Sequence, residues 1–281
     1  MPDGVNTLIG PNTKLIISTS GRVPSLRRYK SLLQDILKLD IAYIPVHSGS
    51  SESPSIEPHR YVSALKGMAC IGGAISRDIK HSIIPYLDEL DESATAVQSV
   101  NTVIVQGDRS LKGYNTDVLG FKAAIEEGIA SSGINVKTAV CYGNGGVTSV
   151  VTSVLSDLGI RVYLCGRNLP KVANRAAELG VELWQGESVD LFVNATPASE
   201  SPLEDAANMV EALKDCKIAF DHEMPGKYLK EYCDAHHIVH IPGEKMYYPQ
   251  MEAQWSLFLD GIVEKSRVAD LLKQADELKD K

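Results

Sequence analysis

Short apolar runs alternate with helical repeats along most of the chain. Residues 15–17 and 41–46 have the apolar character of buried strands, and a helix is predicted between them over residues 24–37. Strands that alternate with helices form mostly parallel sheets with helices packed on their faces. The pattern therefore predicts an α/β protein that begins with a βαβ-like segment.

A strand, a turn and a returning strand are predicted later in the first half. Residues 101–105 are mostly β-branched, a Gly-Asp turn follows, and the second strand continues to Tyr114. Asn115 and Asp117 then introduce the next helix. These polar side chains come at the ends of elements, where side chains converge.

Lys80 lies at the start of another predicted helix. Apolar side chains between residues 83 and 90 recur at helical spacing, and the acidic run at 88–92 is interpreted as the solvated end of this helix. The positive end of the helix dipole disfavours an ammonium at a helix start. An aspartate such as Asp117 beside Lys80 would orient the amine and form a proton-transfer pair. The alternative is a helix cap and a surface lysine, the commoner use of these residue types.

A second series of strands and helices follows a polar linker at residues 130–135. A strand at 138–142 is followed by Gly143, Asn144, Gly145 and Gly146, and a helix is predicted over 147–158. Glycines at this point let the backbone approach a pyrophosphate, and the helix start offers N–H groups. We favour dinucleotide binding over a plain βα turn.

Cations follow the next strand, which is predicted at residues 161–165. Arg167 and Lys171 come after it, and no acidic residue lies at its tip. An acid would accept hydrogen bonds from the ribose of NAD, whereas two cations suit the 2′-phosphate of NADP. The prediction is NADP, with NAD less favoured, and the alternative is a helix start with surface cations. Further parallel strands are predicted at 190–194 and 217–221.

Composition narrows the classes of partner. The 281 residues carry a formal net charge of −8 with a pI near 5.4, which argues against a nucleic-acid partner. No apolar run has the length of a membrane span and the N-terminus lacks a secretion signal, so we expect a cytoplasmic protein without membrane contact. Five widely spaced cysteines indicate buried, reduced thiols. The histidines at 236, 237 and 240 do not complete a ligand set, and no metal site is predicted.

Three motifs resemble the active-site half of the shikimate/quinate dehydrogenase family in order and spacing. They are Lys80, Ser-Val-Asn101-Thr-Val and Asn115-Thr-Asp117-Val-Leu-Gly-Phe. The resemblance implies that Lys80 and Asp117 are the catalytic pair and that Asn101 binds substrate hydroxyls.

The resemblance extends to both ends of the chain and implies further substrate contacts. Ser18 and Ser20 match the pair of serines that binds the substrate carboxylate, and we add Arg22 because a guanidinium suits a planar anion. Ser76 keeps a hydroxyl where the family has threonine. Gln250 corresponds to the family's last substrate contact.

The resemblance also implies cofactor contacts in the second half. The glycine turn corresponds to the family's Gly-x-Gly-Gly motif, and Arg167 and Lys171 match the two basic positions of NADP-preferring members. Asn194, Thr196 and Met246 are implied to lie beside the cofactor.

Four positions depart from the family pattern. Ala74 replaces a substrate-contacting asparagine, and Asp78 replaces a proline. The stretch after Asp221 that contains Met224 offers no tyrosine in register with the one usual in the family, and Val150 occupies the small position of the helix after the glycine turn. A carboxylate at Asp78 would hold the nearby Lys80 ammonium charged and make it a poorer base.

We therefore predict two domains. Residues 1–116, completed by helices at 252–281, form an N-terminal α/β substrate domain, and residues 117–251 form a Rossmann-type NADP-binding domain. The predicted activity is NADP-dependent interconversion of 3-dehydroshikimate and shikimate by a monomer or homodimer. The alternatives are a dehydrogenase for quinate or another ring acid, and a relative that binds ligand with weak turnover.

Overall fold

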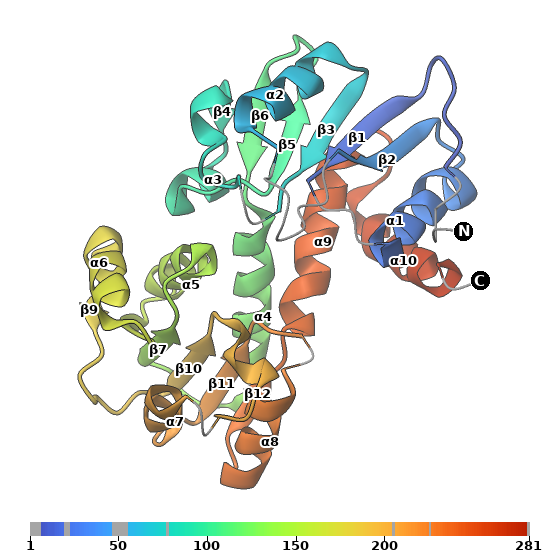
Figure 1. Cartoon of the computed structure of the whole chain (residues 1–281). Coiled ribbons are helices and arrows are strands. Elements are labelled where there is room, and N and C mark those ends of the chain that lie inside the picture. Colours follow the sequence, from blue (N-terminus) through green and yellow to red (C-terminus); the bar gives the residue numbers. More distant parts are fainter. Residues whose placement is uncertain are drawn as a thin grey trace. The chain divides into compact units, whose positions relative to one another are not determined.

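The chain forms two compact units. The computed structural model describes residues 7–19, 23–46, 56–76, 79–203, 206–224 and 226–279. One unit comprises Met1–Thr116 with Met251–Lys281, and the other comprises Asp117–Gln250 (Figure 1). The chain passes from one to the other within a helix each time, since both boundaries fall inside helical segments. The predicted α/β fold is confirmed, and the strands form two six-stranded sheets.

A mixed sheet forms the centre of the first unit. Its order is β2-β1-β3-β5-β6-β4, in which β2, β1 and β3 are parallel and β5 runs antiparallel to β3 and β6. The strands are β1 (Lys14–Ser18), β2 (Ile41–Pro45), β3 (Cys70–Ala74), β4 (Glu89–Leu90), β5 (Thr102–Val105) and β6 (Leu111–Tyr114).

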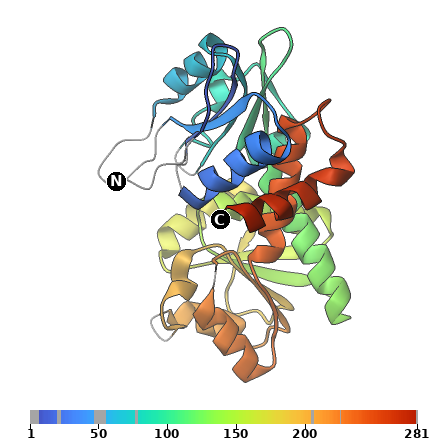
Figure 2. The same ribbon diagram turned by 90° about the vertical axis from the view of Figure 1, so that its right-hand side faces the viewer.

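Helices from both ends of the chain complete the first unit. They are α1 (Val23–Lys30), the π-helix Ser31–Ile36, α2 (Pro58–Gly67), the 3-10 helix Ile84–Tyr86, α3 (Glu92–Val97), the end of α9 (Glu244–Phe258) and α10 (Lys265–Leu278). The helix predicted over 24–37 is thus α1 continued by a π-helix. α10 lies beside α1 in both views (Figures 1 and 2), and the buried Arg28 is ion-paired with Asp276. Trp255 of α9 is fully buried against Tyr29.

Two local predictions in the first unit were wrong. Lys80 does not start an α-helix: residues 79–83 form a turn and only Ile84–Tyr86 is helical, because Pro85 lacks the N–H that a continuing helix needs. The acidic run at 88–92 is not a helix end either. It contains β4, which pairs with β6, and Asp91, whose side chain caps α3.

The second unit is a doubly wound parallel sheet. Its order is β12-β11-β10-β7-β8-β9, so the strand order reverses between β7 and β10. The strands are β7 (Thr138–Tyr142), β8 (Arg161–Cys165), β9 (Glu182–Leu183), β10 (Leu191–Asn194), β11 (Ile218–Asp221) and β12 (Val239–Ile241). The helices are α4 (Thr116–Ser132), α5 (Gly146–Asp157), α6 (Leu169–Leu179), the 3-10 helix Pro197–Glu200, α7 (Ala207–Leu213), α8 (Lys227–His236) and the start of α9.

Apolar side chains cover both faces of this sheet, as expected of parallel strands that are buried on both sides. Ala219 belongs to a core cluster with residues of α7 and α8, whereas the neighbouring Phe220 points to the other face and meets Phe121 of α4 edge-on at 5.1 Å. All five cysteines are buried and free, which confirms the prediction of reduced thiols. In the part of the chain that the structure describes, no helix has the length and apolar character to cross a membrane.

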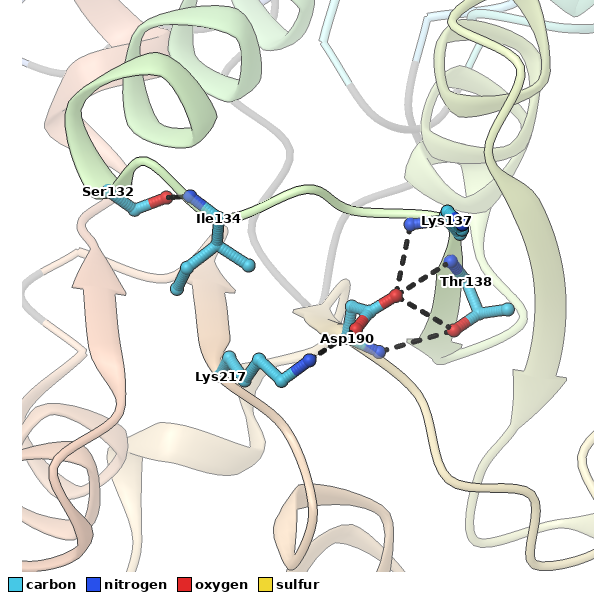
Figure 3. Close-up of polar contacts among 6 residues, drawn as sticks. All are labelled: Ser132, Ile134, Lys137, Thr138, Asp190 and Lys217. Atoms are coloured by element: carbon cyan, nitrogen blue, oxygen red, sulfur yellow. Dashed lines mark hydrogen bonds and ion pairs between the residues drawn. The ribbon is translucent and has the colours of Figure 1, made fainter.

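Asp190 joins three strands at the amino-terminal edge of the second sheet (Figure 3). Its carboxylate accepts hydrogen bonds from the Lys137 N–H at 3.0 Å and the Thr138 N–H at 3.3 Å, and the Lys217 ammonium lies 2.9 Å away. Burial raises the pKa of this carboxyl, but the Lys137 N–H and the Lys217 ammonium outweigh burial, so the pKa is lowered. The ionised carboxylate therefore stabilises the folded unit.

We expect Asp190→Ala to lower the free energy of unfolding by about 1–3 kcal/mol at pH 7, because N–H groups lose a charged acceptor. A pKa lowered by folding stabilises the protein above the unfolded pKa of about 4, and this contribution is lost as pH falls through the folded pKa. Urea unfolding between pH 7 and pH 2 should show the difference between the wild type and the variant shrinking at the acid end. Asp234→Asn, which changes an exposed carboxylate paired with Lys230, is the control and should have little effect. A difference that persists undiminished at pH 2 would contradict the role of the charge.

Candidate active site

A cavity of about 610 Å³ opens at the carboxyl ends of β7, β8 and β10 in the second unit. This is the edge where ligands bind in doubly wound sheets, at the point where strand order reverses. The lining residues are Tyr142, Gly143, Asn144, Gly166, Arg167, Asn168, Lys171, Val172, Thr196, Pro197, Ala198, Ser201, Pro202 and Ala206.

The first residues of the glycine turn, Gly143 and Asn144, line the cavity. Gly143 has φ +140°, which side chains rarely adopt, and a Cβ there would come within 2.9 Å of the Thr196 Cγ2. Gly145 is the N-cap of α5 and Gly146 its first residue, and a Cβ on Gly145 would meet open space. The N-terminal N–H groups of α5 therefore face an accessible region, which suits a phosphate.

Cations line the neighbouring wall. Arg167 and Lys171 are exposed and flank Asn168, whose side chain caps α6 by accepting a hydrogen bond from the Lys171 N–H at 3.1 Å. Burial and the neighbouring Cys165 raise the pKa of Tyr142, and the positive charge of Arg167 opposes this rise. The positive charge of Arg167 thus acts on Tyr142, another residue of the cavity lining. The described lining residues include no carboxylate.

Thr196 lines the cavity but Asn194 does not. Asn194 is fully buried at the end of β10 and accepts hydrogen bonds from the N–H and hydroxyl of Thr196 at 3.1 and 2.8 Å. Met246 is also buried, and a Cβ on Gly120 would clash with its carbonyl oxygen, so α4 and α9 pack closely there. Neither Asn194 nor Met246 lines this cavity, and direct contact with a cofactor stays a prediction for both.

Polar side chains gather at one edge of the sheet in the first unit. Ser18, Ala74 and Thr102 lie in register across β1, β3 and β5. Ser18 is almost completely buried, whereas Thr19 is half-buried and its hydroxyl lies 3.0 Å from that of Ser76. The Ser76 N–H also donates to the Thr19 hydroxyl at 2.7 Å. The ends of β1 and β3 are thereby joined through hydroxyl groups.

Asn101 connects β5 to the start of α4. Its side-chain oxygen accepts hydrogen bonds from the Thr116 N–H and the Thr102 hydroxyl, both at 2.9 Å, and its amide nitrogen donates to the Thr116 hydroxyl at 3.0 Å. Gln254 donates to the Thr102 hydroxyl at 2.8 Å. The network fixes the Asn101 side chain within the first unit.

Lys80 lies beside this network. The Val100 N–H donates to the Lys80 carbonyl at 2.8 Å, which places the half-buried Lys80 next to the residue that precedes Asn101. The first unit therefore brings Ser18, Ser76, Lys80 and Asn101 to one region.

Other predicted substrate residues belong to the second unit or lie outside the described chain. Asp117 is in the first turn of α4, and Gln250 is in α9 against Gly120. Because Lys80 belongs to the first unit and Asp117 to the second, their pairing stays a prediction. Ser20, Arg22 and Asp78 lie outside the described residues.

Sequence reasoning overlooked several polar groups near these sites. Thr19 stands between the two predicted serines, and Gln254 lies one helical turn after Gln250, so spacing could have indicated both. Tyr61 lies in no motif of the sequence that would have indicated a place near the site. It is fully buried, and its hydroxyl donates to the Ile17 carbonyl at 2.8 Å, beneath the end of β1.

Curated relatives of the chain are shikimate dehydrogenases. No protein-family model matches. The shikimate dehydrogenase (NADP(+)) of Geobacillus kaustophilus is 31% identical over 195 residues, which are 63% of this chain and 70% of that protein. The enzyme of Halothermothrix orenii is 31% identical over 199 residues, 69% of this chain and 60% of that protein. Alignments with the relatives from Methanococcus maripaludis and Lysinibacillus sphaericus span 58% and 42% of those proteins.

Solved structures share the fold. A shikimate 5-dehydrogenase-like protein superposes with a TM-score of 0.74 at 22% identity and covers 98% of this chain and 100% of that chain. Quinate dehydrogenase from Corynebacterium glutamicum in complex with NAD gives 0.72 at 22% identity, covering 93% and 99%. Shikimate 5-dehydrogenase from Thermus thermophilus in complex with NADP(H) and shikimate gives 0.67 at 22% identity, covering 94% and 99%. Because the chain is 31% identical to the Geobacillus kaustophilus enzyme across 70% of that protein, it belongs to the shikimate dehydrogenase family.

Proposed function

We propose that the protein is an NADP-dependent oxidoreductase that interconverts 3-dehydroshikimate and shikimate. The observation that carries the proposal is the cavity at the glycine turn, where Arg167 and Lys171 stand without a described carboxylate. In a member of this family, such a wall favours the 2′-phosphate of NADP over the free ribose hydroxyls of NAD.

The residues present fit a dinucleotide phosphate. Gly143 has room for no side chain because Thr196 packs against it, and Gly145 and Gly146 form the start of α5, where backbone N–H groups can bind a phosphate. Gly143, Asn144, Gly145 and Gly146 would hold the pyrophosphate. Arg167 and Lys171 would pair with the 2′-phosphate, and Thr196 would line the opposite wall.

The remaining predicted residues would act on the substrate. When bound, the nicotinamide would supply the hydride chemistry. The Lys80 ammonium would hold and exchange the proton on the reacting oxygen of the ring, and Asp117 would orient the Lys80 Nζ. Asn101 and Gln250 would bind ring hydroxyls, and Ser18, Ser20 and Ser76 would bind the carboxylate and its surroundings, which fixes the ring for reaction.

Quinate or another polyhydroxylated ring acid is the second candidate substrate. It is favoured by Ala74 and Met224, which lack the polar groups usual in the family, and Met224 is 40% exposed. Initial rates with shikimate, quinate and related ring acids, each with NADP and NAD, would decide between them. Reduction of NADP with none of the ring acids, although the protein binds NADP, would favour a binding relative with weak turnover.

Cofactor preference depends on Arg167 if the proposal is correct. Arg167→Ala should weaken the efficiency with NADP by roughly 10- to 100-fold and leave that with NAD little changed, because a charged hydrogen-bond donor to the 2′-phosphate is lost. The measurement is kcat/KM with both cofactors. Arg161→Ala is the matched control, since Arg161 is exposed at the opposite end of β8 and pairs with Glu182. Equal efficiency of the unmodified protein with NAD and NADP would contradict the prediction.

Proton transfer depends on Lys80 in the same proposal. Lys80→Ala should lower kcat by roughly two to four orders of magnitude and change the KM of the ring acid much less. Lys66→Ala, which removes an exposed partner of Asp88 in the first unit, is the control. If Lys80→Ala keeps most of its kcat, the lysine has no part in the chemistry.

A further inference from the structure

Asn194 uses its whole side-chain amide inside the second unit. The nitrogen donates to the Asp221 Oδ1 at 2.8 Å and to the Ser199 hydroxyl at 3.1 Å, while the oxygen accepts the two hydrogen bonds from Thr196. The Thr196 hydroxyl in turn accepts a hydrogen bond from the Ala198 N–H at 3.2 Å. The conformation of the cavity wall at Thr196 and Ala198 therefore depends on how Asn194 is held.

The Asp221 carboxyl group holds the Asn194 nitrogen and so begins this series of hydrogen bonds. It is fully buried at the end of β11, in register with Asn194 of β10, and its Oδ1 also accepts a hydrogen bond from the Glu223 N–H at 3.0 Å. Gly226 leaves room for the other oxygen, since a Cβ on this residue would clash with the Asp221 Oδ2.

A buried carboxyl group has an energetic cost that an apolar side chain would avoid. Asp221 does not line the cavity, so direct contact with a ligand there does not explain the residue. Asp221 instead contacts Asn194, the residue at which β10 ends and the loop with Thr196 begins. A carboxylate oxygen in this place also sets the orientation of the Asn194 amide, because only the nitrogen can donate to it.

We propose that Asp221 is a positioning residue of the nucleotide site, which acts through Asn194 to hold Thr196 and Ala198 as one wall of the cavity. The inference rests on the proposed function, in which this cavity binds NADP. Without Asp221, the Asn194 nitrogen would lose an acceptor and the amide could rotate, and the Thr196 N–H and hydroxyl would then lose their common acceptor.

The test measures the dissociation constant of NADP by titration calorimetry, without substrate or turnover. Asp221→Ala should raise it roughly tenfold, the equivalent of one lost hydrogen bond. Asp190→Ala is the control for general damage, because Asp190 joins the same sheet at its opposite edge and touches none of the cavity residues. Its dissociation constant should stay within about twofold of the wild type.

Two further variants separate positioning from folding. Asp221→Asn keeps the Oδ1 acceptor and should recover most of the NADP affinity, and a loss as large as that in Asp221→Ala would overturn the positioning role. Ser199→Ala removes the other acceptor of the Asn194 nitrogen from a buried residue outside the cavity, and it should weaken NADP binding more than Asp190→Ala does. Asp221→Ser, whose side chain is one atom shorter and lacks the carboxylate oxygen, carries the test if Asp221→Ala does not fold.

The outcomes separate the role of Asp221 from the binding of NADP by the protein. NADP affinity that is unchanged in Asp221→Ala, or in Asp221→Ser if the former is unfolded, overturns the role of Asp221 and leaves the proposed function standing. An equal loss in Asp190→Ala overturns it as well, because the effect is then one of stability. A wild-type protein that does not bind NADP overturns the proposed function and the inference together.

Discussion

Parallel pairing between β7 and β10 is the contact on which the second unit depends. The two strands run in register from Ala139 and Leu191 to Tyr142 and Asn194, and later strands are added outward on both sides. The loops that leave the paired strand ends therefore diverge, and the space between them is the cavity. This pairing brings the loop with Thr196 beside the glycine turn, and the parallel pairing of β7 with β8 brings Arg167 and Lys171 to the same edge.

Features encoded within a few residues were predictable from the sequence. Strands β7, β8, β10 and β11 of the second sheet, the turn at Gly143 and the start of α5 follow from apolar runs and from glycines, whose use depends on local backbone geometry. β4 could not be recognised in this way. Its two residues pair with Lys112 and Gly113, more than twenty positions away, and its acidic sequence gives no strand signal.

The candidate site shows the same division between local and distant information. Motif spacing indicated which strand ends carry polar residues, and Ser18, Ser76, Lys80 and Asn101 do lie in one region of the first unit. The direction of each side chain was not predictable. Asn194 follows an apolar strand as a ligand-binding residue would, yet its amide is directed to Asp221 by a register that only the folded sheet supplies.

The division of the first unit into two separate stretches of chain has a consequence for biosynthesis. The second unit is one continuous segment, whereas Trp255 and the Asp276 partner of Arg28 reach the first unit only after the second has been translated. On the ribosome, residues 1–116 emerge before the C-terminal residues that complete their core. The second unit can therefore fold before the first unit is complete. The apolar surface of the first unit that α9 and α10 cover therefore stays uncovered while residues 117–250 are being synthesised. A chaperone would have its longest opportunity to bind during that interval.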